Sequence, residues 1–249
     1  MRIVIPTPKH REEYIESTAG KCLFKLDKIT DQEKGYHSLD IRIDEKNTIG
    51  LSKLYNNHLS KPSWSWKDAL LDGENNILFI HDDLEIHDAF FTEKLKKAHE
   101  IYDIVGLAGA TSQDYTTPSP SVWHLSKQKP EDARGIVSHY IPKGFQGVSQ
   151  SHYNSAYFGP TPSTVCVIDG LFMSIKMSAL NGKYDIFDED FDFHHYDMAM
   201  CQRATQLGLK IGVWPIFCVH HGLGEFNTPE WKESDRKFKE KYGNYKFKL

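Results

Sequence analysis

The sequence predicts a single α/β domain in which a mostly parallel central sheet is flanked by helices. Short apolar runs rich in Ile, Val, Leu and Phe have the length of strands that are buried on both faces. Segments with helical periodicity lie between these runs, and that alternation is typical of a parallel sheet. The chain has 249 residues, of which 39% are hydrophobic and 26% charged, and this is enough for one sizeable core.

The first elements come directly from this pattern. Residues 3–5 (Ile-Val-Ile) predict a strand that Pro6 stops. Residues 23–26 and 39–43 alternate apolar groups with charges, and we expect one or two further strands there. In residues 48–61 the apolar side chains recur at helical spacing, so this segment predicts a helix.

A strand that runs into acids follows at residues 78–80 (Leu-Phe-Ile). It continues into His81, Asp82 and Asp83, and Glu85 comes two positions later. Parallel strands end where open α/β sheets bind ligands, so these carboxylates suit a divalent cation and a phosphate-bearing substrate. Acidic residues also close strands as ordinary turn formers, and the segment alone leaves both interpretations open.

The rest of the chain continues the alternation after one interruption. Residues 90–101 predict a helix capped by Asp88. Residues 111–164 are rich in Ser, Pro, Gly and Tyr without helical periodicity, so they are expected to be functional or to form short strands. The other expected elements are buried strands at 104–110 and 165–173, a helix at 195–207 ended by Gly208, and an extended segment at 211–219.

Charge and cysteine content narrow the class of protein. The net charge of −4 gives no indication of nucleic-acid binding. Residues 231–249 hold seven basic and three acidic side chains (7 − 3 = +4, leaving −8 elsewhere), and this basic tail is expected to start as an amphipathic helix. Four scattered cysteines favour reduced thiols, and no run has the length of a signal peptide or a membrane span, so we expect a cytoplasmic protein.

Four polar groups lie at the ends of apolar elements. They are the acids after residue 81, Asp169 with Gly170, Asp197 in a first helical turn, and the pair His220-His221. Carboxylates with an imidazole can bind Mn²⁺ or Mg²⁺, and a carboxylate at a helix N-terminus suits a base. Neither common glycine-rich phosphate loop occurs, so a diphosphate would need the metal as its main counter-charge.

Each group also has a purely structural interpretation. Asp169 can form an Asx-turn with Gly170, and Asp197 can stabilise no more than its own helix. Histidines are often buried core residues, so the pair at 220–221 need not bind an ion.

The order of these motifs resembles glycosyltransferases with the GT-A fold, close to the small family-2-like enzymes of viruses and bacterial polysaccharide clusters. The resemblance extends from residue 3 to residue 222. Its seven blocks are TIGLSKLYN (48–56), FIHDDLEI (79–86), IVGLAG (104–109), RGIV (134–137), IDGLF (168–172), FDE…YDMAMC (187–201) and HH (220–221). It implies metal-dependent, inverting transfer of a sugar from a nucleotide-diphosphate donor to an acceptor hydroxyl.

The resemblance also assigns residues. The family's metal-binding D-x-D falls on His81-Asp82-Asp83, which makes Asp83 the ligand of Mn²⁺ or Mg²⁺ and Asp82 its helper. His81 departs from the first acid of that motif. One of His220 and His221 matches the third metal ligand, and the sequence does not distinguish them.

The catalytic base of inverting members falls on Asp197, whereas the second acid that often follows is here Ala199. The nucleotide-sugar contacts that the resemblance implies are Pro6, Thr7, Tyr55, Asn56, His81, Asp82, Asp169 and Gly170. Residues 1–230 form the implied transferase domain, with a nucleotide-sugar half at 1–110, an acceptor and catalytic half at 111–230, and the basic tail at 231–249.

Two other classes of function stay open. A metal-dependent phosphohydrolase or nucleotidyltransferase could use the same acids and histidines. The second class is a catalytically silent nucleotide-sugar-binding module. It is suggested by His81 and Ala199, which stand at positions where the family has acids. A glycan, a lipid-linked sugar, a protein or a modified DNA base could be the acceptor, with residues 111–164 and the basic tail as its expected determinants. A viral source would place the protein in the host cytoplasm.

Overall fold

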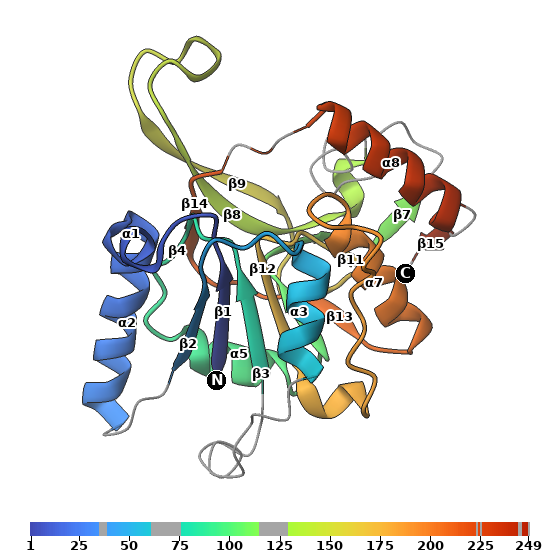
Figure 1. Cartoon of the computed structure of the whole chain (residues 1–249), viewed down its shortest axis with the longest axis horizontal. Helices are drawn as coiled ribbons and strands as arrows, with labels where there is room; N and C mark the ends of the chain where they lie inside the picture. Colours follow the sequence, from blue (N-terminus) through green and yellow to red (C-terminus); the bar gives the residue numbers. More distant parts are fainter. Residues whose placement is uncertain are drawn as a thin grey trace.

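A mixed seven-stranded sheet, sheet A, forms the middle of the molecule (Figure 1). The computed structural model describes residues 1–34, 39–60, 76–114, 129–222, 224, 226–243 and 246–248, and all structural statements concern these residues. The strand order in sheet A is β10 (Ser163–Thr164), β13 (Ile211–Val213), β5 (Ile104–Gly106), β12 (Phe172–Lys176), β3 (Asn76–Ile80), β1 (Arg2–Pro6) and β2 (Asp40–Asp44).

The sheet is less parallel than the sequence predicts. β1 pairs in parallel with β2 and β3, and β5 with β13, but β12 lies antiparallel between β3 and β5. An apolar run indicates that a strand is buried and does not indicate its direction, so this insertion could not be read from the pattern. β1 and β3 are buried along their whole lengths, as expected of central strands.

A second, six-stranded sheet, sheet B, crosses the carboxyl ends of β1 and β3 (Figure 1). It consists of β11 (Val167–Ile168), β6 (Ala108–Ala110), β8 (Ala133–Ile141), β14 (Cys218–His220) and β4 (Leu84–Ile86), and β9 (His152–Gly159) pairs with β8. β7 (Ser112–Asp114) pairs with β15 (Lys246–Lys248). Residues 111–164 thus carry short strands of their own, as one of the two expectations for them requires; residues 115–128 lie outside the described part.

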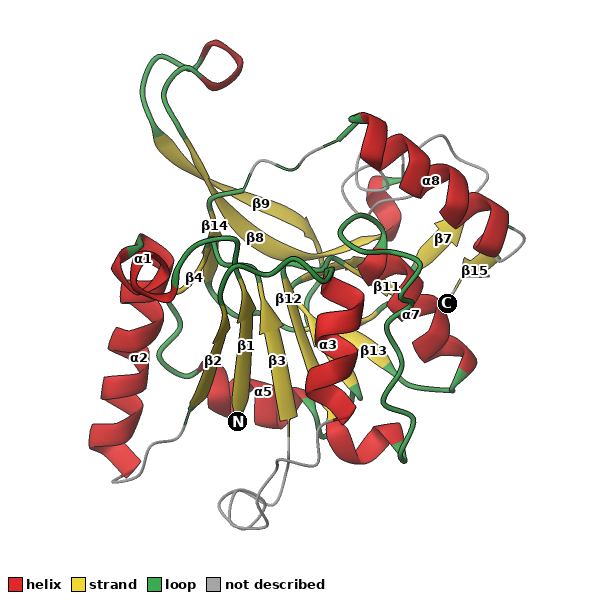
Figure 2. Cartoon of the chain, viewed as in Figure 1, coloured by secondary structure: helices red, strands yellow, loops and turns green. Residues whose placement is uncertain are grey.

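Helices surround the two sheets (Figure 2). They are α1 (Arg11–Glu16), α2 (Thr18–Lys34), α3 (Leu51–Ser60), α5 (Phe91–Ala98), α7 (Tyr196–Gln206) and α8 (Pro229–Tyr242), with short 3₁₀ turns η1 (Pro130–Asp132), η2 (Phe145–Gly147) and η3 (Met177–Leu180). Among these helices none combines the length and the apolar character that crossing a bilayer requires.

Of the one or two strands expected in residues 23–26 and 39–43, the structure has one, β2. Residues 23–26 lie inside α2, because Ala19, Leu23 and Leu26 recur at helical spacing and are buried together. The run at residues 104–110 is not one strand. It divides into β5 of sheet A and β6 of sheet B, and the runs at 165–173 and 211–219 divide in the same way.

Helix α8 contains the first part of the predicted basic tail. Its Phe238 and Tyr242 belong to the hydrophobic core, and Trp231 is also buried. The predicted boundary at residue 230 stays a prediction, but these side chains give α8 an apolar face on the body of the protein. Residues 244, 245 and 249 of the tail lie outside the described residues.

Replacing the N-cap of α8 tests whether this helix folds with the body. The Thr228 hydroxyl accepts a hydrogen bond from the Trp231 amide at 3.1 Å. We expect Thr228→Ala to lower the free energy of unfolding by about 1 kcal/mol, because one helix-end amide loses its acceptor. Thr228→Ser keeps the acceptor and should behave like the parent chain in urea denaturation. An unchanged midpoint for Thr228→Ala would contradict folding of α8 together with the core.

Candidate active site

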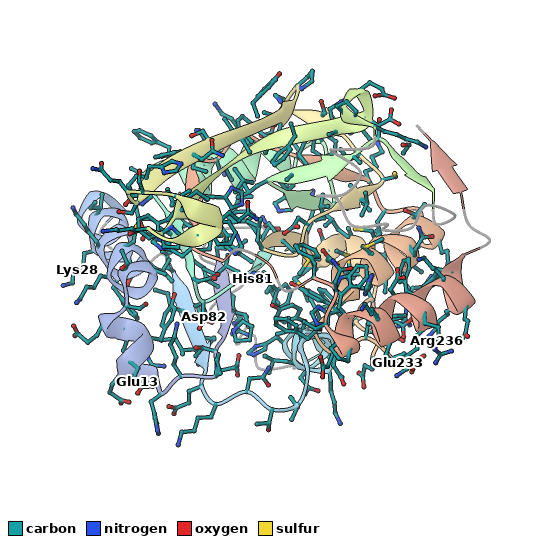
Figure 3. The ribbon with its side chains drawn as sticks, turned by 90° about the horizontal axis from the view of Figure 1, so that it is seen from above. Glu13, Lys28, His81, Asp82, Glu233 and Arg236 are labelled. Atoms are coloured by element: carbon teal, nitrogen blue, oxygen red, sulfur yellow. The ribbon has the colours of Figure 1, made fainter. Side chains whose placement is uncertain are left out.

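The turn after β3 brings three predicted site residues to the place where the two sheets meet. The amide of His81 donates to the Leu171 carbonyl at 3.1 Å, and the amide of Leu84 donates to the His81 carbonyl at 3.3 Å. The chain therefore leaves sheet A after Ile80 and enters β4 of sheet B within a tight turn. In the view from above, His81 and Asp82 lie between the N-terminal helices on one side and the C-terminal helices on the other (Figure 3).

His81, Asp83 and His220 form a compact cluster at this junction. Their ligand atoms all lie within 4.8 Å of one another, and Asp83 Oδ1 is 3.2 Å from His220 Nε2. Antiparallel pairing of β14 with β4 places His220 opposite Leu84 and so next to Asp83. The neighbouring His221 points elsewhere, with its Nε2 2.5 Å from Glu85 Oε1. The structure thus brings one histidine of the pair to Asp83.

The cluster has the features of a cation site. Asp83 Oδ1 and His220 Nε2 are buried, and their 3.2 Å contact does not meet the geometry of a hydrogen bond. Buried polar atoms are nearly always bonded, so two unsatisfied atoms facing each other fit a pair of ligands. A carboxylate oxygen is a ligand that suits Mn²⁺, and imidazole is the commonest protein ligand of metal ions in general. The residues present therefore fit a divalent cation.

Electrostatics favour the protonation states that ligands need. Burial alone would raise the pKa of Asp83, but the contacts with His220 and His81 outweigh it and hold that pKa below its usual value. Burial, followed by the neighbouring His220, lowers the pKa of His81. Because the Tyr196 hydroxyl donates to the Gly170 carbonyl (3.1 Å), His81 Nε2 is the donor toward Tyr196 (2.9 Å), which leaves the imidazole lone pair on Nδ1.

Asp197 lies in the first turn of α7 and lines one cavity together with Asp83 and His220. Its Oδ2 accepts from the Gly170 amide at 3.0 Å, and its Oδ1 accepts from the Met198 amide at 2.8 Å. Burial, followed by the charge of nearby Asp169, raises the pKa of Asp197 to about 7. A carboxylate with a pKa near neutrality is well matched to general base catalysis. Asp169 forms the predicted Asx-turn, since its Oδ1 accepts from the Leu171 amide at 3.0 Å.

Two cavities meet at the cluster. The larger, of about 520 Å³, is lined by Asp83 and His220 and also by Asp169, Gly170 and Asp197. The smaller, of about 410 Å³, is lined by Pro6 and Thr7. His81 and Asp83 line both cavities, so the cluster stands between them.

Asp82 is turned toward the smaller cavity. Its Oδ2 accepts from the Thr7 hydroxyl at 2.6 Å and from Lys9 Nζ at 3.1 Å. These contacts hold the side chain on the side of Pro6 and Thr7, which are predicted nucleotide contacts. The placement suits a contact with the nucleotide better than a direct metal bond.

Tyr55 and Asn56, two predicted nucleotide contacts, have packing and backbone-bonding roles in the structure. Tyr55 is fully buried against Phe79, with ring centroids 4.2 Å apart. The Asn56 side chain bonds the backbone carbonyl and amide of Phe187. Neither lines the two cavities, and their nucleotide contacts stay predictions.

Several site residues carry no sequence signal that would single them out. Tyr196 links His81 to Gly170, and a Cβ built on Gly170 would lie 2.1 Å from its hydroxyl. The His139 ring lies 5.6 Å from that of His220, and burial lowers the pKa of His139 to about 4. The one sequence feature that could have identified Gly222 as a site residue is its position directly after the histidine pair.

Gly222 sits so close to the cluster that a side chain would crowd it. A Cβ there would lie 2.7 Å from both Asp83 Oδ2 and His220 Nε2. We expect Gly222→Ala to weaken Mn²⁺ binding by about 10-fold or more, as disturbed ligand support generally does. Isothermal titration with Mn²⁺ measures the change, and thermal denaturation without metal checks that the fold is kept. Unchanged Mn²⁺ affinity in the folded variant would argue against metal at this cluster.

The mixed sheet flanked by helices makes this an α/β protein that is compatible with a GT-A-like fold. The chain belongs to the glycosyltransferase like family, whose profile matches residues 19–246, and this membership makes it a glycosyltransferase. No curated protein gives a significant match. Among 152 matching solved chains is the crystal structure of A197 from STIV, with 11% sequence identity over 86% of this chain and 81% of that one and a TM-score of 0.43.

Proposed function

We propose that this glycosyltransferase is metal-dependent and inverting, and that it takes its sugar from a nucleotide-diphosphate donor. One observation carries the proposal. The Asp83–His220 pair and Asp197, a carboxylate with a pKa near 7, line the same cavity. A leaving-group site and a base that share one cavity are what a single displacement requires.

The residues have separate tasks in this proposal. The nucleotide occupies the smaller cavity against Pro6 and Thr7, with Asp82 beside it. Asp83, His220 and His81 would hold Mn²⁺ or Mg²⁺, which when bound supplies positive charge for the leaving diphosphate. The sugar and the acceptor hydroxyl share the larger cavity with Asp169 and Asp197.

The proposed reaction is a direct substitution at the anomeric carbon. The Asp197 carboxylate takes the proton of the acceptor hydroxyl. At the same time the oxygen of that hydroxyl forms the new bond to the anomeric carbon. The bond from the carbon to the diphosphate oxygen breaks, and its electron pair leaves with the diphosphate. One substitution inverts the configuration. Tyr196 and the Gly170 amide hold His81 and Asp197 in place during the step.

Donor use and product stereochemistry test the proposal. A thermal-shift screen of nucleotide sugars, with and without Mn²⁺, should identify a donor that stabilises the fold only with the metal. Proton NMR of the product should then show an inverted anomeric configuration. Retention would overturn the role of Asp197. Hydrolysis of the donor at the same rate with and without acceptor would instead favour the phosphohydrolase.

A further inference from the structure

A second cluster of ligand-type side chains lies outside the cavities. It consists of Cys22 on α2, Glu85 on β4 and His87 just after that strand. One ligand atom from each lies within 4.8 Å of the other two. None of the three lines either cavity of the active site.

Glu85 is the centre of this cluster. Its side chain is only 4% exposed, yet it carries a carboxylate that two imidazoles approach. His87 Nε2 lies 2.6 Å from Oε2, and His221 Nε2 lies 2.5 Å from Oε1. Both carboxylate oxygens are therefore engaged, one on each side. The Cys22 thiol lies beside this group, bonded to the carbonyl of Ile86 at 3.0 Å.

The chemistry of the three groups points to zinc and not to the metal of the active site. Thiolate sulfur, imidazole nitrogen and carboxylate oxygen are the ligands that Zn²⁺ takes in proteins. Mn²⁺ and Mg²⁺ prefer oxygen donors and gain little from a thiolate. If the histidines served only to neutralise the buried carboxylate of Glu85, the thiol of Cys22 on helix α2 would not be needed beside it. The convergence of all three on one point is what a soft-donor cation site needs.

We propose that Cys22, Glu85 and His87 bind one Zn²⁺ ion at a site distinct from the Asp83–His220 cluster. His221 holds the second oxygen of Glu85, as outer hydrogen-bond partners of ligating carboxylates do. Three protein ligands leave one position of a tetrahedral site, and the half-exposed His87 puts that position within reach of water. The ion fixes α2 to β4.

The site has a structural consequence for the active centre. Glu85 is two residues from Asp83 on the same short segment, and His221 is next to His220. Side chains alternate along an extended chain, so His220 points to Asp83 while His221 points to Glu85. An ion that fixes Glu85 therefore stabilises the two backbone segments from which the active-site cluster is built.

Cobalt spectroscopy on the full chain tests the site without any enzymatic assay. Co²⁺ replaces Zn²⁺ in such sites, and a thiolate ligand produces a charge-transfer band in the near ultraviolet. We expect this band in the parent chain and expect Zn²⁺ to abolish it by displacement. Cys22→Ala should remove the band, and His87→Ala should weaken Zn²⁺ binding by more than about 100-fold. The His87 side chain is 39% exposed, so its replacement should leave the fold intact.

Asp83→Ala is the matched control, because it disables the other cluster. It should keep the thiolate band and the Zn²⁺ affinity of the parent chain, whatever its effect on catalysis. A parent chain with no thiolate band, or a band that persists in Cys22→Ala, would overturn the proposal. Loss of Zn²⁺ binding in Asp83→Ala but not in His87→Ala would also overturn it, since the ion would then belong to the active site.

Discussion

Asp197→Asn is expected to lower the rate of sugar transfer by about 100- to 10,000-fold, the usual contribution of a general base. The amide cannot take the proton of the acceptor hydroxyl, although it has nearly the shape of the carboxylate. Binding of donor and Mn²⁺ should change little, because Asp197 is not among the residues proposed to hold the metal or the nucleotide. Single-turnover rates with a saturating donor, together with donor titrations, separate the two effects. Residual transfer near the parent rate would remove Asp197 from the mechanism.

The pH profile gives the same prediction a second, independent readout. Burial and Asp169 raise the pKa of Asp197 to about 7, so the base is lost by protonation below that pH. For the parent enzyme we expect kcat/KM to fall about tenfold for each pH unit below about 7. Asp185→Asn is a suitable control, because that carboxylate is exposed and pairs only with Arg203 among the described residues. It should keep both the rate and the profile.

The same pKa has a consequence for stability, with a definite sign. Between the ordinary value of 3.8 and about 7, the folded state binds more protons at Asp197 than the unfolded chain does. The contribution of Asp197 to the free energy of unfolding therefore falls as pH rises through that window. Asp197→Asn removes this loss, so the stability of the variant relative to the parent should rise as pH increases from about 4 to about 7, on top of a constant cost for the one backbone amide that loses its acceptor. A variant that stays folded at the pH of the assay cannot owe its inactivity to unfolding.

Periodicity and strand-end chemistry explain which parts of the fold the sequence predicts. Helix α7 and the strand before His81 follow directly from such patterns. The run at residues 104–110 is uniformly apolar, so its sequence does not indicate that the chain passes from sheet A to sheet B within it. In the structure the chain passes from β5 to β6 at Leu107, and Gly106 allows the close approach of Ile168, since a Cβ there would lie 2.9 Å from it. Apolar character reports burial, whereas the strand partner is decided by contacts far away in the sequence.

The site shows the same division between local and distant information. The position of Asp83 after a buried strand is local, and the structure places it in a cluster of ligand atoms. The choice between His220 and His221 depends on which way each side chain points at the end of β14, whose last residue is His220, and that follows from the pairing of β14 with β4. Tyr196 bonds His81 across 115 positions of sequence, and such a contact leaves no trace in either segment.

Asp83→Ala is expected to weaken Mn²⁺ binding by more than about 100-fold and to abolish metal-dependent donor binding. Even residues that only support a ligand change metal affinity by about 10- to 100-fold, so loss of the one carboxylate in the cluster should cost at least as much. Isothermal titration of Mn²⁺ with and without a nucleoside diphosphate measures both quantities. Unaltered Mn²⁺-dependent donor affinity in Asp83→Ala would refute the assignment of Asp83 as a metal ligand.

The adjacent histidines provide a matched pair for the same experiment. His220 Nε2 lies 3.2 Å from Asp83 Oδ1, whereas His221 Nε2 bonds Glu85. We expect His220→Ala to reduce Mn²⁺ affinity by about 10- to 100-fold and His221→Ala to leave it within a few-fold of the parent value. The two substitutions remove the same group from neighbouring positions, so a general loss of packing would affect both alike. Equal losses of Mn²⁺ affinity in the two variants would refute the assignment of the cluster as a metal site. A larger loss in His221→Ala than in His220→Ala would place the metal beside Glu85.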